Sequence, residues 1–412
     1  MSWQSLYLAP NERLRKLLGL ARRLAERLTI TGYREYCAGP PAGRALLSYM
    51  VSPLLPPPRW RDKVLFSNRG LAQEIPRALN ELGYELDILH YENTAWTPKR
   101  HYDLFVGHAA YNFCRIAEAL GESAVRIYFS TGIYWREWNR REAERFYELA
   151  VRSGYFLPAD RAIAQSEEEA NSRADGIIFL GNREVAHTYA RFTNAIGLNN
   201  AAYPVLWDGV VKQEYGPGRS HFLFFSGRGN VHKGLDLLLE AFVDTGLHLH
   251  ICQHLEPAFR RVYKQELEGA PNIHPHGYIP MRSPAFYRLA AQCNWVISAT
   301  CAEGQPGAVI ECMAHGLIPI LPNSANIDVE SWGVRLPRCD VDTIRTVIRE
   351  AAGMPERECR RRAREMLAEV PESHSVERFR SSFKRAVETI VAAVRRGSGR
   401  TGGAVLGHAL CR

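Results

Sequence analysis

The fold is decided by the stretch WVISATCAEGQPGAVIECMAHGLIPILP, residues 295–322. It reads as an apolar strand (295–299), a loop rich in glycine and proline, a short helix, and a second apolar strand (317–321). Glu303 lies in the loop, and Glu311 follows eight residues later inside the helix. Open α/β sheets bind ligands at the carboxyl ends of their strands. We therefore expect both carboxylates to face one bound molecule.

The same alternation of strand and helix extends through most of the chain. In the N-terminal half, strands are expected at 64–67, 85–90, 104–107, 125–130, 177–180 and 202–206, with helices at 71–82, 112–120, 135–152 and 183–192. In the C-terminal half, strands are expected at 221–225, 247–252, 273–279, 295–299 and 317–321, with helices at 233–243, 256–268, 283–292 and 307–315. Further helices are expected at 340–352, 355–369 and 375–395. This alternation predicts an α/β fold with two Rossmann-like halves, each a parallel sheet covered by helices.

Shifts in composition suggest where the domains begin and end. Residues 39–58 are rich in proline and are expected to connect rather than to form regular structure. The expected order is an N-terminal segment at 1–60, a first Rossmann-like domain at 61–206, a linker at 207–220, a second Rossmann-like domain at 221–374, a helix at 375–395 that crosses back to the first domain, and a flexible tail at 396–412.

Composition excludes several classes of protein. The 412 residues are 46% hydrophobic and 23% charged, a globular balance at a length that favours two domains. No apolar run reaches the roughly 20 residues of a membrane helix. Nine scattered cysteines without a C-x-x-C pair favour a reducing cytoplasm and argue against structural zinc. The net charge of +8 favours phosphate-rich partners, and the absence of a nucleic-acid motif argues against DNA or RNA.

Residues 11–28 form an amphipathic pattern with leucines on one face and arginines over the rest. Two interpretations stay open. The helix packs on the protein with a solvated basic face, or it anchors the protein to an anionic membrane surface.

A second chemical motif is the turn SGRGNVHKG, residues 226–234, between an apolar strand and a helix. A glycine turn at a helix N-terminus offers backbone N–H groups and the positive end of the helix dipole to an anion. Arg228 and Lys233 add two cations, and only seven of the 52 basic residues are lysine. The turn matches neither the P-loop nor the G-x-G-x-x-G pattern. It predicts a diphosphate site.

Three segments occur in a characteristic order: SGR…KGLDLLLEAF from residue 226, HGYIP from residue 276, and EGxPGxxxECMAHG from residue 303. Together, residues 221–322 resemble the C-terminal half of the retaining GT-B glycosyltransferases of family 4. The N-terminal half is similar only in its strand-helix plan. The resemblance implies two domains facing across a cleft, and transfer of a sugar from a nucleoside diphosphate sugar to an acceptor hydroxyl without a metal or other cofactor. It also makes 61–206 the acceptor domain and 221–374 the donor domain, and it implies polysaccharide biosynthesis in a bacterium with a glycan as acceptor. The amphipathic pattern at 11–28 suggests an acceptor at the membrane face, such as a lipid-linked glycan.

The resemblance assigns roles to individual residues. Arg228 and Lys233 would hold the diphosphate, and Glu311 would accept hydrogen bonds from the ribose hydroxyls. Glu303 and the following backbone would hold the sugar, and the backbone at 278–279 would contact the base. The predicted donor-binding residues are Gly227, Arg228, Lys233, Tyr278, Ile279, Glu303, Gly304, Gln305, Pro306, Gly307 and Glu311. The predicted catalytic residues are Glu303, Lys233, Arg228 and His108.

Several positions depart from the family pattern. Gln305 and Pro306 alter the sugar loop, and residues 323–326 (NSAN) stand where the family tends to have a glycine pair. The family's N-domain histidine is absent from 128–132, so His108 is the expected substitute; its alternative role is that of an ordinary loop residue. These departures motivate a second hypothesis, a GT-B module that binds a nucleotide sugar or a partner without turnover.

Two further features have simple explanations. Tyr134, Trp135 and Trp138 cluster in the sequence and are expected to pack in a core, with stacking on an acceptor sugar as the alternative. The D-x-D pattern at 340–342 resembles a metal motif but stands at a helix start, where aspartate is a common cap.

Overall fold

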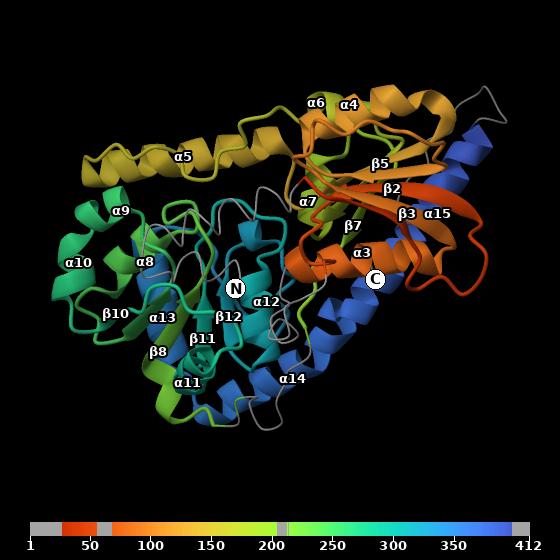
Figure 1. Cartoon of the computed structure of the whole chain (residues 1–412). Coiled ribbons are helices and arrows are strands. Elements are labelled where there is room, and N and C mark those ends of the chain that lie inside the picture. The colour runs from red at the N-terminus through yellow and green to blue at the C-terminus, as the bar shows by residue number, and fades with distance from the viewer. Residues whose placement is uncertain (1–26, 56–67, 204–211, 213, 398–412) are drawn as a thin grey trace. The chain divides into compact units, whose positions relative to one another are not determined.

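The computed structural model describes residues 27–55, 68–203, 212 and 214–397 (Figure 1). The chain divides into two compact units. Unit 1 comprises residues 1–131, 165–198 and 376–412, and unit 2 comprises residues 132–164 and 199–375. The predicted anchor helix at 11–28 lies almost wholly outside the described residues, as do the strand expected at 64–67, much of the linker and nearly all of the tail.

Unit 1 is built on a seven-stranded sheet of order β1-β3-β2-β4-β5-β6-β7. All neighbouring strands are parallel except β1 and β3, which pair antiparallel. The strands are β1 (Thr29–Tyr33), β2 (Gly43–Tyr49), β3 (Tyr84–His90), β4 (Leu104–Gly107), β5 (Val125–Ser130), β6 (Gly176–Leu180) and β7 (Ala195–Leu198). The predicted strands at 85–90, 104–107, 125–130 and 177–180 are confirmed.

The prediction that 39–58 is a connecting segment is wrong, because β2 lies in the interior of the sheet between β3 and β4. Its last five residues are buried. The prolines that suggested a connection stand at 40, 41, 53 and 56–58, outside the strand. Proline excludes only the positions that it occupies from a central strand, so the apolar run between them was free to pair.

The helices of unit 1 agree with the strand-helix rhythm. They are α3 (Asn68–Glu81), α4 (Ala110–Leu120), α6 (Glu168–Arg173), α7 (Arg183–Thr188) and α15 (Val376–Gly397). The C-terminal α15 packs against α3, where Arg380 pairs with Glu74 at 2.6 Å and Lys384 pairs with Glu81 at 2.8 Å. Ion pairs and a buried apolar face therefore attach α15 to the rest of unit 1.

Unit 2 is built on a six-stranded parallel sheet of order β10-β9-β8-β11-β12-β13. The strands are β8 (His221–Phe225), β9 (His248–Cys252), β10 (Ile273–Pro275), β11 (Trp295–Ile297), β12 (Ile318–Leu321) and β13 (Val334–Arg335). All five strands predicted for this half are present, although β10 is shorter than expected. Their runs of buried apolar residues are typical of strands covered on both faces.

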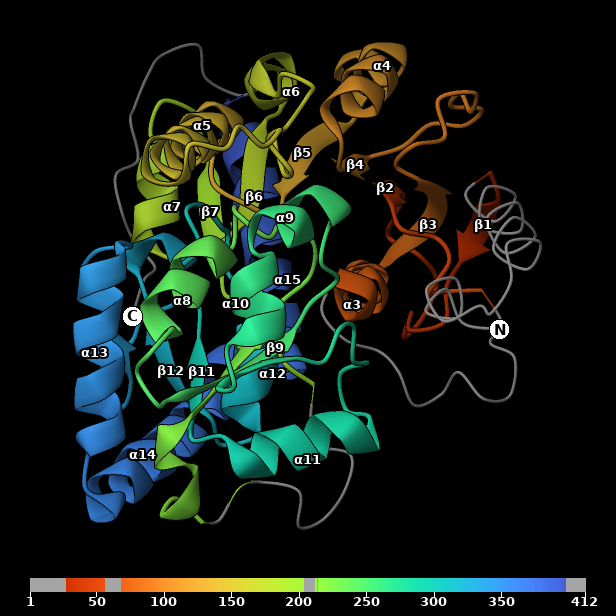
Figure 2. The ribbon, with the colours of Figure 1, turned by 90° about the vertical axis from the view of Figure 1, so that its left-hand side faces the viewer.

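The helices of unit 2 are α5 (Trp135–Ser153), α8 (Leu235–Phe242), α9 (Pro257–Val262), α10 (Lys264–Gly269), α11 (Pro284–Gln292), α12 (Gly307–Ala314), α13 (Val341–Gly353) and α14 (Glu356–His374). Helices α8 and α13 lie side by side (Figure 2). Asp340 caps α13 by accepting a hydrogen bond from the Thr343 N–H at 2.8 Å, as expected for this D-x-D. Within the described residues, no helix combines the length and apolarity needed to cross a membrane.

Helix α5 is bound to the rest of unit 2 by the contacts of two arginines, of which Arg145 is buried. Arg145 donates to the Ala299 carbonyl at 2.9 Å, and Arg152 donates to Asp236 at 2.6 Å. These bonds join α5 to the loop that follows β11 and to α8. Residues 132–164, expected from their place in the sequence to belong with the first sheet, are therefore grouped with the second.

Both sheets contain a point where the strand order reverses direction. In unit 1 the chain passes from β2 to β3 on one side and continues from β4 on the other. In unit 2 it passes from β8 through β9 to β10, then restarts at β11 on the opposite side of β8. Open α/β sheets bind ligands in the crevice at such a point, beyond the carboxyl ends of the strands. The residues after β8 and β11 are therefore the first place to look for a site in unit 2.

Candidate active site

The turn after β8 is held in place by buried amides. Asn230 donates to the Gln253 side chain at 2.7 Å, and the Gln253 amide in turn donates to the Gly227 carbonyl. Gly234 has a φ of +79°, and a Cβ there would lie 2.3 Å from the Ala299 carbonyl oxygen. Only glycine meets both conditions. The turn is thereby pressed against the end of β11.

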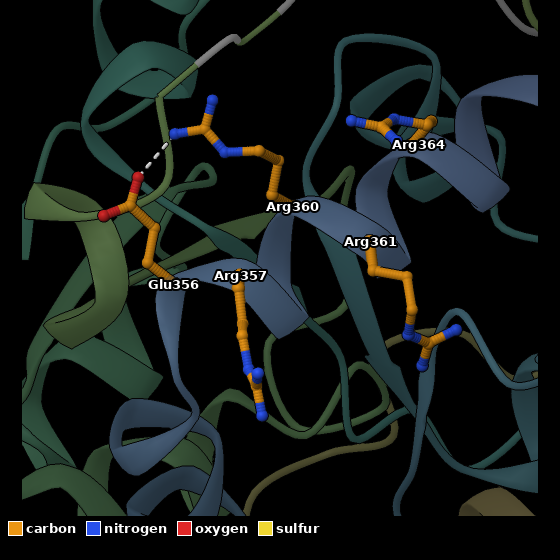
Figure 3. A pocket seen from close by; sticks show the side chains of 5 residues that line it. All are labelled: Glu356, Arg357, Arg360, Arg361 and Arg364. Carbon is orange, nitrogen blue, oxygen red and sulfur yellow. Dashed lines mark hydrogen bonds and ion pairs between the residues drawn. The ribbon is translucent and has the colours of Figure 1, made fainter.

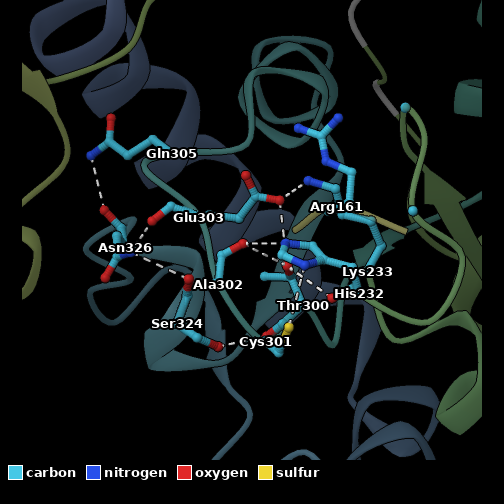
Figure 4. Close-up of polar contacts among 12 residues, drawn as sticks. Arg161, His232, Lys233, Thr300, Cys301, Ala302, Glu303, Gln305, Ser324 and Asn326 are labelled. Carbon is cyan, nitrogen blue, oxygen red and sulfur yellow. Dashed lines mark hydrogen bonds and ion pairs between the residues drawn. The ribbon is translucent and has the colours of Figure 1, made fainter. Parts of the chain in front are cut away.

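This packing brings Lys233 to Glu303, and their side chains form an ion pair (Figure 4). The lysine comes from the turn after β8, and the glutamate comes from the loop after β11. Both side chains are only about one-tenth exposed. Burial and the Arg161 guanidinium lower the pKa of Lys233, whereas the paired Glu303 carboxylate favours the charged form of the lysine. Two residues that the sequence predicted separately are therefore joined at the crevice of unit 2.

Residues from the segment around α5 lie beside this pair, and among them sequence reasoning considered only Trp138, for which an acceptor contact was the alternative to core packing. The guanidinium of Arg161 lies 5.9 Å from the ring centroid of Trp138, which stacks on His232 at 4.7 Å. His232 also contacts the Ala302 carbonyl through Nε2 at 2.7 Å, and burial lowers its pKa to about 4. Trp138 is buried and packs as expected for a core residue. No sequence signal indicated that Arg161 would lie here.

Gln305 and three asparagines fix the loop that follows Glu303. The Gln305 amide donates to Asn199 at 2.8 Å and to the Asn326 carbonyl at 2.9 Å, while its oxygen accepts from the Asn200 N–H at 2.7 Å. Asn326 donates to the Glu303 carbonyl at 2.7 Å and has a φ of 55°. Asparagine tolerates this left-handed conformation, so it serves where the family tends to have glycine. The departures at 305 and 326 belong to one hydrogen-bonded network.

Glu311 lies beneath the loop on α12 and is almost fully buried. Arg282 donates to both of its carboxylate oxygens, at 2.6 and 2.8 Å through one nitrogen. The Tyr203 N–H donates to the same carboxylate at 3.2 Å. Burial raises the pKa of Glu311, and the Arg282 cation opposes that shift. The carboxylate predicted to hold a ribose is therefore already bound to an arginine that sequence reasoning missed.

The other predicted donor residues differ in their exposure to solvent. Gly227 and Arg228 are exposed on the turn after β8. Tyr278 is 37% exposed and Ile279 is half-buried, both in the loop that follows β10. Gly304 is buried in the loop after β11, Pro306 is the N-cap of α12, and Gly307 is its first residue. All of these residues belong to unit 2, and their roles toward a ligand stay predictions.

His108 belongs to unit 1, where it follows β4 at the reversal of the strand order. Its backbone N–H donates to the Ser48 carbonyl of β2 at 3.0 Å, and its ring Nδ1 lies 2.9 Å from the Phe129 carbonyl oxygen of β5. The rings of Tyr49 and Tyr91 meet it edge-on, with centroids at 5.7 and 5.3 Å. Burial lowers its pKa. His108 is a neutral, well-oriented ring at the crevice of its own sheet.

Two cavities of unit 2 lie at other places. One, of about 370 Å³, is on the basic face of α14, where Arg357, Arg361 and Arg364 project while Arg360 pairs with Glu356 at 2.5 Å (Figure 3). The other, of about 580 Å³, is lined by four histidines of the sheet. Neither is lined by a predicted site residue. At the candidate site, Lys233 pairs with Glu303 and Arg282 pairs with Glu311.

Comparison with known proteins finds similarity in structure only. No protein-family model matches the chain, and no curated protein matches it in sequence. Sucrose-phosphate synthase from Thermosynechococcus elongatus is similar over 86% of this chain and 100% of its own, with a TM-score of 0.61 and 13% identity. HepE from Anabaena, solved with UDP-glucose, is similar over 85% of this chain and 100% of its own, with a TM-score of 0.56 and 11% identity.

TarM from S. aureus, solved with fondaparinux, alpha-GlcNAc-glycerol and UDP, is similar over 70% of this chain, with a TM-score of 0.51 and 14% identity. This chain covers 55% of TarM, about half of its length. All three are GT-B glycosyltransferases. The chain has the GT-B fold. In the GT-B fold each half carries its own largely parallel sheet, as units 1 and 2 do here.

Proposed function

We propose that the chain is a glycosyltransferase that moves a sugar from a nucleoside diphosphate sugar to an acceptor hydroxyl, with retention of configuration. The observation that carries this proposal is the meeting of Lys233 and Glu303 where the strand order of unit 2 reverses. A cation beside a helix N-terminus suits a diphosphate, and a carboxylate suits sugar hydroxyls. The GT-B fold, shared with neighbours that were solved with UDP and with UDP-glucose, supports sugar transfer from a nucleotide sugar.

The proposed reaction depends most on the groups around the departing phosphate. When the glycosidic bond to the diphosphate breaks, negative charge grows on the β-phosphate oxygen. Lys233, Arg228 and the N-terminus of α8 would stabilise that charge without a resident metal, as preorganised cations and dipoles do. Lys233 would exchange Glu303 for the diphosphate, which would leave the Glu303 carboxylate to accept hydrogen bonds from the sugar.

Binding of the ribose would require a similar exchange at Glu311. Its carboxylate is engaged by Arg282, so the arginine would move as the ribose hydroxyls replace it. Arg282 has a φ of 60°, a left-handed conformation that is strained for a residue with a side chain. The base would meet the loop that carries Tyr278 and Ile279, and His108 would help to place the sugar from unit 1.

The neighbours suggest which compounds to test first. HepE was solved with UDP-glucose and TarM with a glycan and UDP, so UDP-glucose is the first donor and an oligosaccharide the first acceptor. We also propose a lipid-linked acceptor at an anionic membrane surface, approached through residues 11–28, and a setting in bacterial polysaccharide biosynthesis. Sedimentation with anionic liposomes, compared between the full chain and a chain lacking residues 1–28, tests the membrane part.

The proposal is tested by following released nucleotide and glycosylated product with a panel of UDP, GDP and ADP sugars. We expect one donor class to be consumed in the presence of an acceptor, and the anomeric configuration of the product, measured by NMR, to match that of the donor. Inversion would contradict the proposed stereochemistry alone. Consumption that depends on added Mg²⁺ and is abolished by EDTA would contradict metal independence alone.

A second candidate is a GT-B module that binds a nucleotide sugar without transferring it. One observation favours it: both predicted donor carboxylates are held by cations of the chain itself. Calorimetry separates the two candidates. Saturable binding of a nucleotide sugar without release of nucleotide, across the whole acceptor panel, would favour the module.

A further inference from the structure

Five histidines lie on three adjacent strands of unit 2, away from the candidate active site. They are His221 on β8, His248 and His250 on β9, and His274 and His276 at and just beyond β10. One residue separates His248 from His250, and one residue separates His274 from His276. Alternate residues of a strand project from the same face. His221 is in register with His248, and His250 is in register with His274. The five rings therefore form one layer, here called the histidine lattice.

The rings of the lattice meet through their nitrogen atoms. His221 Nδ1 lies 3.0 Å from His250 Nε2, and His250 Nδ1 lies 3.0 Å from His276 Nε2. A separate pair joins His248 Nδ1 to His274 Nε2, also at 3.0 Å. In each contact one nitrogen carries the proton and the other offers a lone pair. His250, the most buried of the five, connects the longer row.

The lattice opens into the cavity of about 580 Å³. Four of its histidines line this space, with Glu214 and the end of α11 completing the wall. His221 and His248 are the first residues of their strands, whereas Lys233 and Glu303 follow the carboxyl ends of β8 and β11. The two pairs His221–His250 and His248–His274 therefore begin at the amino end of the sheet, away from Lys233 and Glu303, and only His276 lies beyond the carboxyl end of its strand, β10.

Packing alone gives no reason for this concentration of imidazoles. A face of a parallel sheet is ordinarily filled by branched apolar side chains, which bury surface without leaving polar atoms to be satisfied. Here 5 of the chain's 14 histidines are gathered on one face. Imidazole nitrogen is a preferred ligand of zinc, copper and nickel ions. A ligand that prefers this donor would account for the arrangement.

We propose that the histidine lattice binds divalent late transition-metal ions such as Zn²⁺, one between His221 and His250 and one between His248 and His274. Two nitrogens that bind one tetrahedral zinc at about 2.0 Å lie roughly 3.3 Å apart, close to the observed separations. Among the described residues, no three side chains of metal-binding type already converge on one point. Each ion is therefore held by two imidazoles, with water completing its shell.

The protons balance without an added reagent. In each pair, the nitrogen that carried the shared proton gives it up, and the same ring takes a proton from solvent at its other nitrogen. In the longer row, His250 then keeps its proton on Nδ1 and donates it to His276 Nε2. Such a contact fixes the tautomer of a metal-bound histidine, so His276 is a positioning residue. Lys212 also lines the cavity, but its amine donates to the Ala291 carbonyl at 2.5 Å.

Titration of the full chain with ZnCl₂ by calorimetry tests the proposal. Two variants each remove one site: His250→Gln and His248→Gln. We expect each to lose one of the two binding events and the double variant to lose both. His187→Gln removes an exposed histidine of unit 1 and is the matched control, with unchanged binding. Retention of wild-type stoichiometry by the double variant, or the absence of saturable binding in the wild type, would overturn the proposal.

A spectroscopic measurement keeps the test valid if a variant folds poorly. Cu²⁺ alone, added to the wild-type chain, should give an electron paramagnetic resonance spectrum with hyperfine coupling to imidazole nitrogen. A spectrum of copper bound by oxygen only would overturn the proposal, whatever the variants do. Nucleotide-sugar binding should be the same in the His248→Gln/His250→Gln protein as in the wild type, so failure of the metal site and failure of the proposed transferase function are told apart.

Discussion

The two sheets of the chain reverse their strand order in the same way but place different chemistry at the reversal. In unit 2 the crevice holds charged pairs, Lys233 with Glu303 and Arg282 with Glu311. In unit 1 it holds His108 between Tyr49 and Tyr91, a neutral aromatic group. Charges suit a diphosphate, whereas neutral rings suit an uncharged sugar or hydroxyl. The difference predicts that the two units bind different groups, a charged one in unit 2 and a neutral one in unit 1. Substitutions in each unit test this prediction.

The largest effect is expected for Lys233→Ala. This change removes the buried cation proposed to stabilise the departing phosphate, and loss of one preorganised group of this kind lowers turnover by about 10²–10³-fold. Nucleotide release under saturating donor measures the effect. Lys264→Ala, on the exposed surface of α10, is the control. Equal turnover of the two variants would contradict the role of unit 2 in handling charge.

A large effect on stability is expected at the second charged pair. Arg282→Ala leaves the Glu311 carboxylate buried without its main partner, which costs about 3–5 kcal/mol of unfolding free energy. The double variant Arg282→Met/Glu311→Gln removes both charges and should recover much of that loss. Denaturant unfolding measures both. If Arg282→Ala unfolds like the wild type, the carboxylate is not dependent on the arginine, and the site is more open than the contacts indicate.

A smaller effect on stability is expected from Gly234→Ala. A side chain at this left-handed position costs roughly 1–2 kcal/mol, and its Cβ would also meet the Ala299 carbonyl at 2.3 Å. Gly227→Ala in the same turn is the matched control, because a Cβ there meets nothing within 4 Å. Thermal unfolding compares the two. Equal melting temperatures would show that the turn does not press against β11 in solution.

Much of this comparison could be anticipated from the sequence, because the informative features are local. Apolar runs bounded by glycine and proline predicted most strands, and the turn carrying Lys233 and the loop carrying Glu303 each have recognisable residues. Strand β2 was missed because prolines flank it closely, although none occupies a position within it.

The features that could not be predicted from the sequence depend on contacts between residues far apart in the chain. Arg282 stands 29 residues before Glu311, just beyond the HGYIP segment, and nothing local marks it as a partner of that glutamate. Asn200 and Gln305 are 105 residues apart. The grouping of 132–164 with unit 2 rests on Arg145 and Arg152, which look like ordinary surface arginines of an amphipathic helix. Pairings of this kind are set by how elements pack, and single-sequence patterns do not encode them.

Acid should weaken unit 2 before unit 1. Burial lowers the pKa of His232 and of His315 to about 4, from 6.5. Between those values the unfolded chain binds protons that the folded unit does not, so stability falls as the pH drops from about 6.5 toward 4. Hydrogen exchange resolved by peptide, at pH 6.5 and at pH 4.5 with correction for intrinsic rates, should show α8 and α12 losing protection. Earlier loss in α3 and β2 would reverse the expected order.

The smallest effect is expected for His108→Gln, and it tests the neutral side of the comparison. Glutamine keeps a side-chain group able to hydrogen-bond to the Phe129 carbonyl but removes the ring that packs on Tyr49. If His108 only places the sugar, turnover should fall by about tenfold, equivalent to about 1.4 kcal/mol of barrier. The dissociation constant of the free nucleoside diphosphate should stay the same, because the phosphate contacts belong to unit 2. His187→Gln, an exposed histidine of the same unit, should change neither quantity. A matching loss of nucleotide affinity in His108→Gln would mean that unit 1 also contributes to the diphosphate, and the division of tasks between the two crevices would not hold.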